Sequence, residues 1–241
     1  MKRRLMTVSA IFTIFIFFLI TERIIAEPLV FPSLDRILQA LLDIGGETDA
    51  LLSLATSLLR LFLVIAISGF SAILLGYLAS QHEWLEYYLT PFVTILRTIP
   101  VLSVIVVILI VFGFLLAPYI ITFLMVFPLF FQGTLDGIKA IDRTYLDIYH
   151  LDQQSAISGI RYVFYPLTKD RILTTFLQSA GLGIKVLVMA EYLAQTPRSI
   201  GNAIYLARIN LRYDEVFAYT LILILLAVAI ESLVRTYRRE A

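Results

Sequence analysis

Long apolar stretches separated by short polar segments make up most of the chain. Six of them are predicted to cross a membrane as helices, at about 5–26, 57–79, 91–112, 118–132, 172–193 and 216–234. A helix rises about 1.5 Å per residue, so roughly 20 apolar residues cross the hydrocarbon core of a bilayer. The pattern therefore predicts an all-α, polytopic membrane protein that forms one transmembrane domain over residues 1–241.

Two polar segments break this pattern. Residues 27–52 are rich in proline, glycine and acidic side chains, and they predict an extended loop with one amphipathic helix at about 33–43, for which Ser33 is the N-cap. Residues 133–171 mix apolar and polar positions, and they predict two short amphipathic helices at the membrane edge. This second segment contains no glycine-rich phosphate-binding loop, so the chain is not expected to hydrolyse nucleotide by itself.

Composition supports a membrane protein and excludes several other classes. Hydrophobic residues make up 60% of the chain and charged residues 15%, whereas soluble domains carry roughly 25% charged residues. The net charge of +1 argues against a nucleic-acid-binding protein, which needs a basic face. The chain has no cysteine, which excludes disulfides and thiolate metal ligands, and its two histidines are too far apart in sequence to indicate a metal site.

The distribution of lysine and arginine predicts the orientation. If the N-terminus is cytoplasmic, 11 of the 19 cations lie in cytoplasmic segments and four in external loops. The first apolar stretch is either a signal peptide or a membrane helix, and Ile24-Ile25-Ala26 lacks the small residues of a cleavage site. We therefore expect an uncleaved first helix, both termini in the cytoplasm, and a location in the plasma (inner) membrane.

Small residues recur on two of the predicted helices. Ser68, Ala72 and Gly76 follow one another at every fourth position, which predicts close packing against another helix. Gly181 and Gly183 lie in a second group of small residues, which predicts a tightly packed and deformable part of the fifth span.

Two charged residues lie within the fifth predicted span. Lys185 is about 22 Å along this helix, where a lysine is costly unless it faces water or is paired. It lines a pathway, pairs with an acid on another helix, or extends to the outer interface. Glu191 lies on another face of the helix, and it contacts Arg97 or Arg60, fixes an external gate, or ends the span at the water boundary. The candidate residues of the translocation pathway or gate are therefore Lys185, Glu191 and Arg97.

The segment Asp147–Gln153, with Pro166 at 13 residues after Gln153, resembles the cytoplasmic motif of permease subunits of ATP-binding-cassette importers. The resemblance is to the group that takes up sulfonates, taurine, nitrate or thiamine-like precursors. In that motif the family has glutamate, alanine and glycine where this chain has Asp147, Tyr149 and Gln153. Further landmarks of the family cover nearly the whole chain: Phe31-Pro32-Ser33, Ser57-Leu58-Leu59-Arg60, Arg97-Thr98-Ile99-Pro100, Ala190-Glu191-Tyr192-Leu193 and Ser199-Ile200-Gly201.

The resemblance implies a non-catalytic subunit that works as a homodimer with two cytoplasmic ATPase subunits and an external solute-binding protein. ATP and Mg²⁺ would bind to the ATPase, and this chain would hold no cofactor. The coupling contacts expected from the motif and the residues around it are Asp147, Tyr149, Leu151, Gln153, Ser155 and Pro166. The match at Ala190-Glu191 favours a role for Glu191 close to the gate.

Alternatives to this function remain open at the level of sequence. An ordinary interfacial loop would account for residues 133–171 without an ATPase contact. A self-sufficient carrier or channel driven by an ion gradient would more often show paired acids or broken helices in repeated halves. A membrane scaffold would leave Lys185 without a purpose. If Lys185 faces a pathway, it favours an anionic solute such as a sulfonate.

Overall fold

The computed structural model describes residues 2–25, 27, 30–142, 159 and 164–240, and the regular elements in these residues are helices. The long helices are α1 (Lys2–Ile25), α3 (Thr48–Gln81), α5 (Val101–Lys139), α8 (Tyr165–Ala194) and α10 (Tyr213–Glu240). The shorter helices are α2 (Leu34–Gly46), α4 (Glu83–Thr98) and α9 (Ile200–Ile209). The predicted all-α membrane architecture is confirmed.

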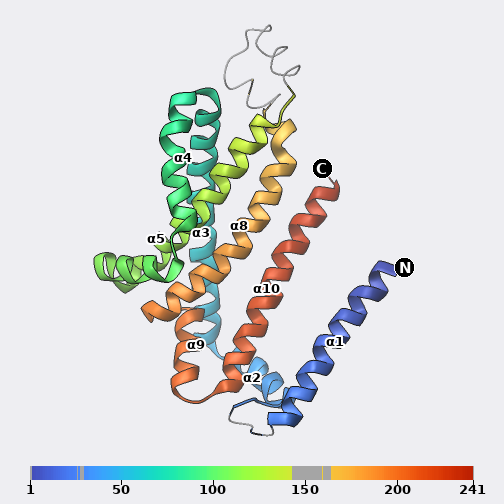
Figure 1. Ribbon diagram of the computed structural model, residues 1–241. Coiled ribbons are helices and arrows are strands. Elements are labelled where there is room, and N and C mark those ends of the chain that lie inside the picture. The colour runs from blue at the N-terminus through green and yellow to red at the C-terminus, as the bar shows by residue number, and fades with distance from the viewer. Residues whose placement is uncertain (1, 26, 28–29, 143–158, 160–163, 241) are drawn as a thin grey trace.

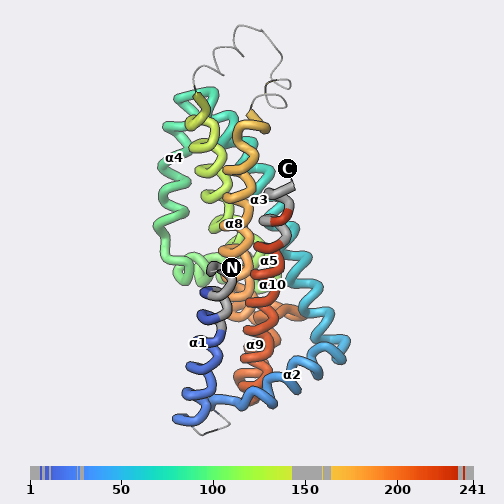
Figure 2. The backbone as a smooth tube through the Cα atoms, turned by 90° about the vertical axis from the view of Figure 1, so that its right-hand side faces the viewer, coloured from blue at the N-terminus to red at the C-terminus, as the bar shows by residue number. Residues whose placement is uncertain are grey.

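The long helices run side by side, and the chain crosses the bundle repeatedly (Figures 1 and 2). Among the described residues, four segments are long and apolar enough to cross a membrane: Thr48–Gln81, Val101–Lys139, Tyr165–Ala194 and Tyr213–Ser232. Helix α1 coincides with the predicted first span and stands to one side of the bundle (Figure 1). The start of α1 and the end of α10 point towards the end of the bundle where α5 finishes and α8 begins (Figure 1).

The structure divides residues 91–132 differently from the sequence pattern. A single span was expected at 91–112, but α4 ends at Thr98 and Ile99 is extended, because the residue before Pro100 is disfavoured in the helical conformation. Helix α5 then continues to Lys139 with one break at Gly113, where φ is 72° and ψ is 176°. The six predicted spans are therefore not six separate helices.

Gly113 lets the first part of α5 fold back onto the second part. Its backbone conformation is open essentially to glycine alone. Ile105, before the break, packs in one buried cluster with Ala117 and Ile121, after the break, and with Val186 of α8. The segment around the break runs across the long axis of the bundle rather than along it (Figures 1 and 2).

Helices α3, α5 and α8 form the centre of the bundle, and small residues allow their close approach. Ser68 and Ala72 are fully buried on α3, and a Cβ at Gly76 would lie 3.0 Å from the carbonyl oxygen of Phe131. A Cβ at Gly183 would lie 3.1 Å from Leu61. This close packing holds α8 against α3 and α5, and thereby positions the side chains on the surface of α8.

Helix α2 confirms the amphipathic helix expected between the first two spans. It begins directly after Ser33, which is the N-cap residue but makes no capping hydrogen bond with its side chain. Its apolar face, with Ile37, Ala40 and Ile44, packs in a buried cluster with residues of α10. At this end of the bundle (Figure 1), α2 therefore packs against α10.

The segment predicted to couple to an ATPase lies mostly outside the described residues. Asp147, Tyr149, Leu151, Gln153 and Ser155 all fall there, whereas Pro166 lies in the first turn of α8. The two short amphipathic helices expected there lie mostly outside the described residues as well, and the flanking residues 133–139 and 165–171 belong to α5 and α8. Backbone hydrogen bonding continues a helix beyond its apolar residues, so the hydropathy pattern ended the fourth span too early and began the fifth span too late.

Candidate functional site: a buried ion pair and the open face of α8

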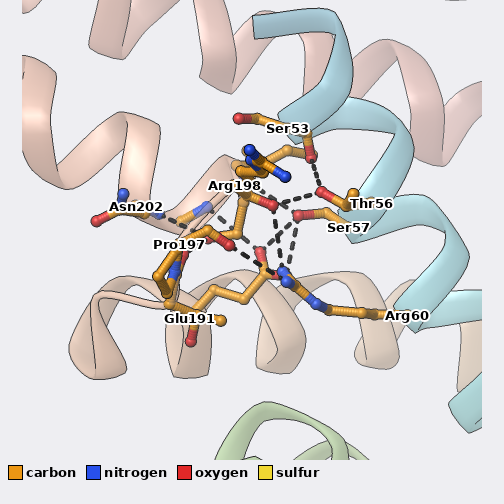
Figure 3. Close-up of polar contacts among 12 residues, drawn as sticks. Ser53, Thr56, Ser57, Arg60, Glu191, Pro197, Arg198 and Asn202 are labelled. Carbon is orange, nitrogen blue, oxygen red and sulfur yellow. Dashed lines mark hydrogen bonds and ion pairs between the residues drawn. The ribbon is translucent and has the colours of Figure 1, made fainter. Parts of the chain in front are cut away.

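Glu191, near the end of α8, is a fully buried carboxylate that joins three helices (Figure 3). Arg60 Nη1 of α3 lies 2.9 Å from Oε1 and forms an ion pair with it. Ser57 Oγ lies 2.9 Å from Oε1 and 2.8 Å from Oε2, and the backbone N–H of Gly201 donates to Oε2 at 3.3 Å. A buried carboxylate is costly unless it is paired and hydrogen-bonded, and this one meets both conditions.

Arg60 also fastens the connection between α8 and α9. Its guanidinium donates to the carbonyl oxygens of Pro197, at 3.2 Å, and Arg198, at 3.4 Å. The Thr56 hydroxyl donates to the same Arg198 carbonyl (Figure 3). One arginine therefore links the end of α8 to the connection that follows it.

The same cluster supplies hydrogen-bond partners for the backbone N–H groups in the first turn of α9. The first N–H groups of a helix have no partner within it. Here Ile200 N donates to Ser57 Oγ at 2.9 Å, Gly201 N donates to Glu191, and Asn202 N donates to the N-cap Ser199 Oγ at 3.0 Å. The negative Glu191 is also favourably placed at the positive end of the α9 dipole.

A second feature is the open face of α8, which carries polar side chains along its length. Arg171, Thr174, Gln178 and Lys185 are three, four and seven residues apart, which places them within about 60° of one another around the helix. Lys185 is exposed, although its neighbours Ile184 and Val186 are buried. Among the described residues, the Lys185 side chain makes no hydrogen bond or ion pair, so the structure does not support pairing with an acid on another helix.

Gly181 lies on this open face and not in a helix interface. Nothing lies within 4 Å of the position that a Cβ would take at Gly181, in contrast to Gly183. The two glycines are two residues apart and therefore face different sides of α8. The close packing expected from both glycines is seen at Gly183 only.

Arg97 is apart from Glu191. It is exposed at the end of α4 and borders a polar cavity of about 240 Å³ between α4, α5 and α8, which Arg171, Thr174 and Gln178 also line. Of the two partners considered for Glu191, the structure selects Arg60. Because Glu191 is fully buried, it does not line an open pathway in this conformation.

Residues 71–239 match the family described as binding-protein-dependent transport system inner membrane components. The chain belongs to this family. It is 26% identical over 220 residues to the taurine transport system permease protein TauC of Escherichia coli (strain K12). This alignment covers 89% of this chain and 80% of TauC. Its fold is similar to a chain of the MetNI methionine ABC transporter in an inward-facing conformation, with a TM-score of 0.58 and 13% identity, over 76% of this chain and 95% of that chain.

Membership of this family establishes which kind of transport protein the chain is. As a permease subunit of an ABC importer, this chain contributes to the translocation pathway, which decides against the self-sufficient carrier and the scaffold. Three of the family landmarks, at residues 57–60, 190–193 and 199–201, come together in the permease around Glu191.

Sequence reasoning missed two parts of these sites. The carbonyl oxygens of Pro197 and Arg198 as partners of Arg60 carry no sequence signal, because any residue supplies a carbonyl. The polar face of α8 did carry a signal, since Arg171, Thr174 and Gln178 recur at helical spacing before Lys185. Gln132 and Asp136 line the same cavity from α5, on a helix that was predicted to end at 132.

Proposed function

We propose that two copies of this permease enclose a pathway for a small anionic solute, and that the open face of α8 lines it. The observation that carries the proposal is Lys185, an exposed cation within a membrane-spanning helix and without a partner among the described side chains. A lysine at that depth is costly in lipid but not beside water. A water-filled pathway between two copies accounts for its position, and its charge favours an anion.

The solute class is a sulfonate or a similar small anion. The relative TauC is a permease of a taurine transport system, and this similarity supports the assignment. An external solute-binding protein delivers the solute to the outer mouth of the pathway and makes most of the selection. Lys185 then attracts the anion into the membrane by its charge.

The energy comes from a separate cytoplasmic ATPase, which binds ATP and Mg²⁺, while this chain supplies no catalytic residue. The coupling contacts are Asp147, Tyr149, Leu151, Gln153 and Ser155, on the segment between α5 and α8. Pro166 suits the start of α8, because a proline in the first turn of a helix removes no hydrogen bond from within the helix.

The permease lies in the inner membrane as one domain, with both termini in the cytoplasm. The excess of lysine and arginine near the termini and in residues 133–171 supports this orientation. The Glu191 cluster is then at the outer side, where it fixes the ends of α3, α8 and α9 to one another as part of the external gate.

The pathway is tested by replacing Lys185 with glutamine. We expect Lys185→Gln to lower the uptake of a small sulfonate about tenfold or more, because a hydrogen bond to a charged group contributes roughly 1.5–3 kcal/mol. Arg36→Gln is the matched control: it removes one positive charge from the exposed surface of α2 and should leave uptake unchanged. Equal uptake by the wild type and Lys185→Gln would contradict the pathway assignment.

The coupling segment is tested by changing Tyr149 and Leu151 together to glutamate. Two buried charges in an interface should abolish both recovery of the cognate ATPase with the permease and ATP-driven uptake. The permease itself should remain folded and inserted, as judged by gel filtration in detergent. Undiminished recovery of the ATPase together with normal transport would rule out this segment as the contact.

A further inference from the structure

We propose that the polar cavity between α4, α5 and α8 is an anion-binding site, in which Arg97 and Arg171 hold one sulfonate or carboxylate group. The inference rests on the proposed transport of an anionic solute, and it identifies a site within the protein where that solute binds transiently. The cavity has a volume of about 240 Å³, which leaves room for a small organic anion and some of its water.

Asp136 fixes one side of the cavity. The Gln132 amide donates to Asp136 Oδ1 at 2.7 Å, and Arg171 Nη2 lies 3.6 Å from Oδ2. These two contacts use both oxygens of the carboxylate. Asp136 therefore orients Arg171 towards the cavity but leaves most of the five N–H donors of its guanidinium available.

Arg97 faces the cavity from the end of α4 and has no such partner. Among the described side chains it makes no ion pair or hydrogen bond, and Asp136, the carboxylate that lines the cavity, already contacts Arg171 and Gln132. The cavity thus has two arginines and one aspartate, a net charge of 2 − 1 = +1. One monovalent anion would neutralise it.

The other polar groups match the same ligand. Gln178 lines the cavity from α8, and its amide makes no hydrogen bond among the residues that the structure describes, so its N–H groups are available to an anion. A guanidinium binds the oxygens of a sulfonate or carboxylate through two parallel N–H donors. The site therefore offers donors from three side chains that lie on α4 and α8.

The cavity borders the same face of α8 that carries Lys185 farther along the helix. Gln178 and Lys185 are seven residues apart on one face, which is about 10 Å along the helix. An anion that moves along this face meets positive charge at two levels. Two weak sites, one after the other along the route, suit a pathway, because a solute that is bound too tightly at one site would not leave it.

The site is tested by titrating the full-length permease in lipid nanodiscs with ethanesulfonate, and separately with the neutral isostere ethanesulfonamide, by calorimetry. The wild type should bind ethanesulfonate saturably and ethanesulfonamide at least tenfold more weakly. Arg97→Gln should weaken ethanesulfonate binding about tenfold or more, and Arg97→Lys, which keeps the charge and loses the planar pair of donors, should lie between them. Arg36→Gln removes a positive charge elsewhere and should bind as the wild type does.

Several results would overturn the site: no saturable binding of ethanesulfonate, equal binding of the two ligands, or equal binding by the wild type and Arg97→Gln. Thermal unfolding of each variant shows whether it is folded, and Arg97→Lys gives a second variant if Arg97→Gln is not. ATP-driven sulfonate uptake by the same variants separates the two proposals. If ATP-driven uptake occurs and is the same in the wild type and the Arg97 variants, the binding site is contradicted but the transport of an anion is not. If binding depends on Arg97 but no ATP-driven sulfonate uptake occurs, the proposed transport of an anion is contradicted but the binding site is not.

Discussion

The buried carboxylate of Glu191 is stabilised by its contacts with Arg60, Ser57 and Gly201. Removing one member of a buried ion pair leaves the other uncompensated, at a cost of about 3–5 kcal/mol. We therefore expect Glu191→Ala to lower the free energy of unfolding of the detergent-solubilised permease by about this amount. Glu215→Ala, which removes a carboxylate from the more exposed pair with Arg212, is the comparison and should cost less than about 1 kcal/mol. Similar losses for both variants would contradict a special role for the Glu191 cluster.

Gly201 is the residue that allows α9 to approach α8. A Cβ at this position would lie 2.4 Å from the backbone nitrogen of Tyr192 and 2.5 Å from Glu191 Cβ, and backbone cannot move aside easily. We expect Gly201→Ala to destabilise the permease by about 1–3 kcal/mol through overpacking. Gly45→Ala is a matched control with nothing within 4 Å. If Gly201→Ala melts at the wild-type temperature, the close approach is not as tight as the structure indicates.

The sequence identified the charged residues of these sites but not their pairing. Lys185 and Glu191 were recognisable because charges are rare in apolar helices. The choice between Arg60 and Arg97 as the partner of Glu191 depended on how three helices pack, and the hydropathy pattern contains no such information. Arg97 was a sequence candidate for the pathway or gate, but that it lines the same cavity as Arg171 could be seen only in the structure.

At the scale of elements, α5 depends on the backbone at Gly113. Any other residue would be strained at φ 72° and ψ 176°, by roughly 1–3 kcal/mol. We expect Gly113→Ala to lower the thermal stability of the permease and to loosen the packing of Ile105 against Ala117. Gly46→Ala, at a glycine without this backbone conformation, should have little effect. A Gly113→Ala variant with unchanged stability would mean that α5 does not fold back here.

Hydropathy located the apolar segments but not the ends of the helices. Helix α2 was predicted well because its apolar period is a local signal that ends at Pro32 on one side and at two glycines on the other. The division between α4 and α5 was missed, although Pro100 is a local signal for it, because the apolar pattern continues across the break. The turn at Gly113 involves packing between distant residues, which a single glycine does not reveal.

For the whole molecule, orientation gives a direct prediction. The chain has no cysteine, so one introduced cysteine reports its own accessibility. His82, between α3 and α4, and Asn210, after α9, are both exposed and lie near opposite ends of the bundle (Figure 1). A membrane-impermeant maleimide should label Asn210→Cys in intact spheroplasts, and His82→Cys only after permeabilisation. The reverse pattern would invert the topology.

The central claim is that the pathway lies in this chain and the energy source on another. It is tested most directly by sulfonate uptake into proteoliposomes that contain the permease and its solute-binding protein, with and without the cognate ATPase. We expect uptake only when both the ATPase and ATP are present, and little uptake by Lys185→Gln. Uptake that continues undiminished without the ATPase would contradict it.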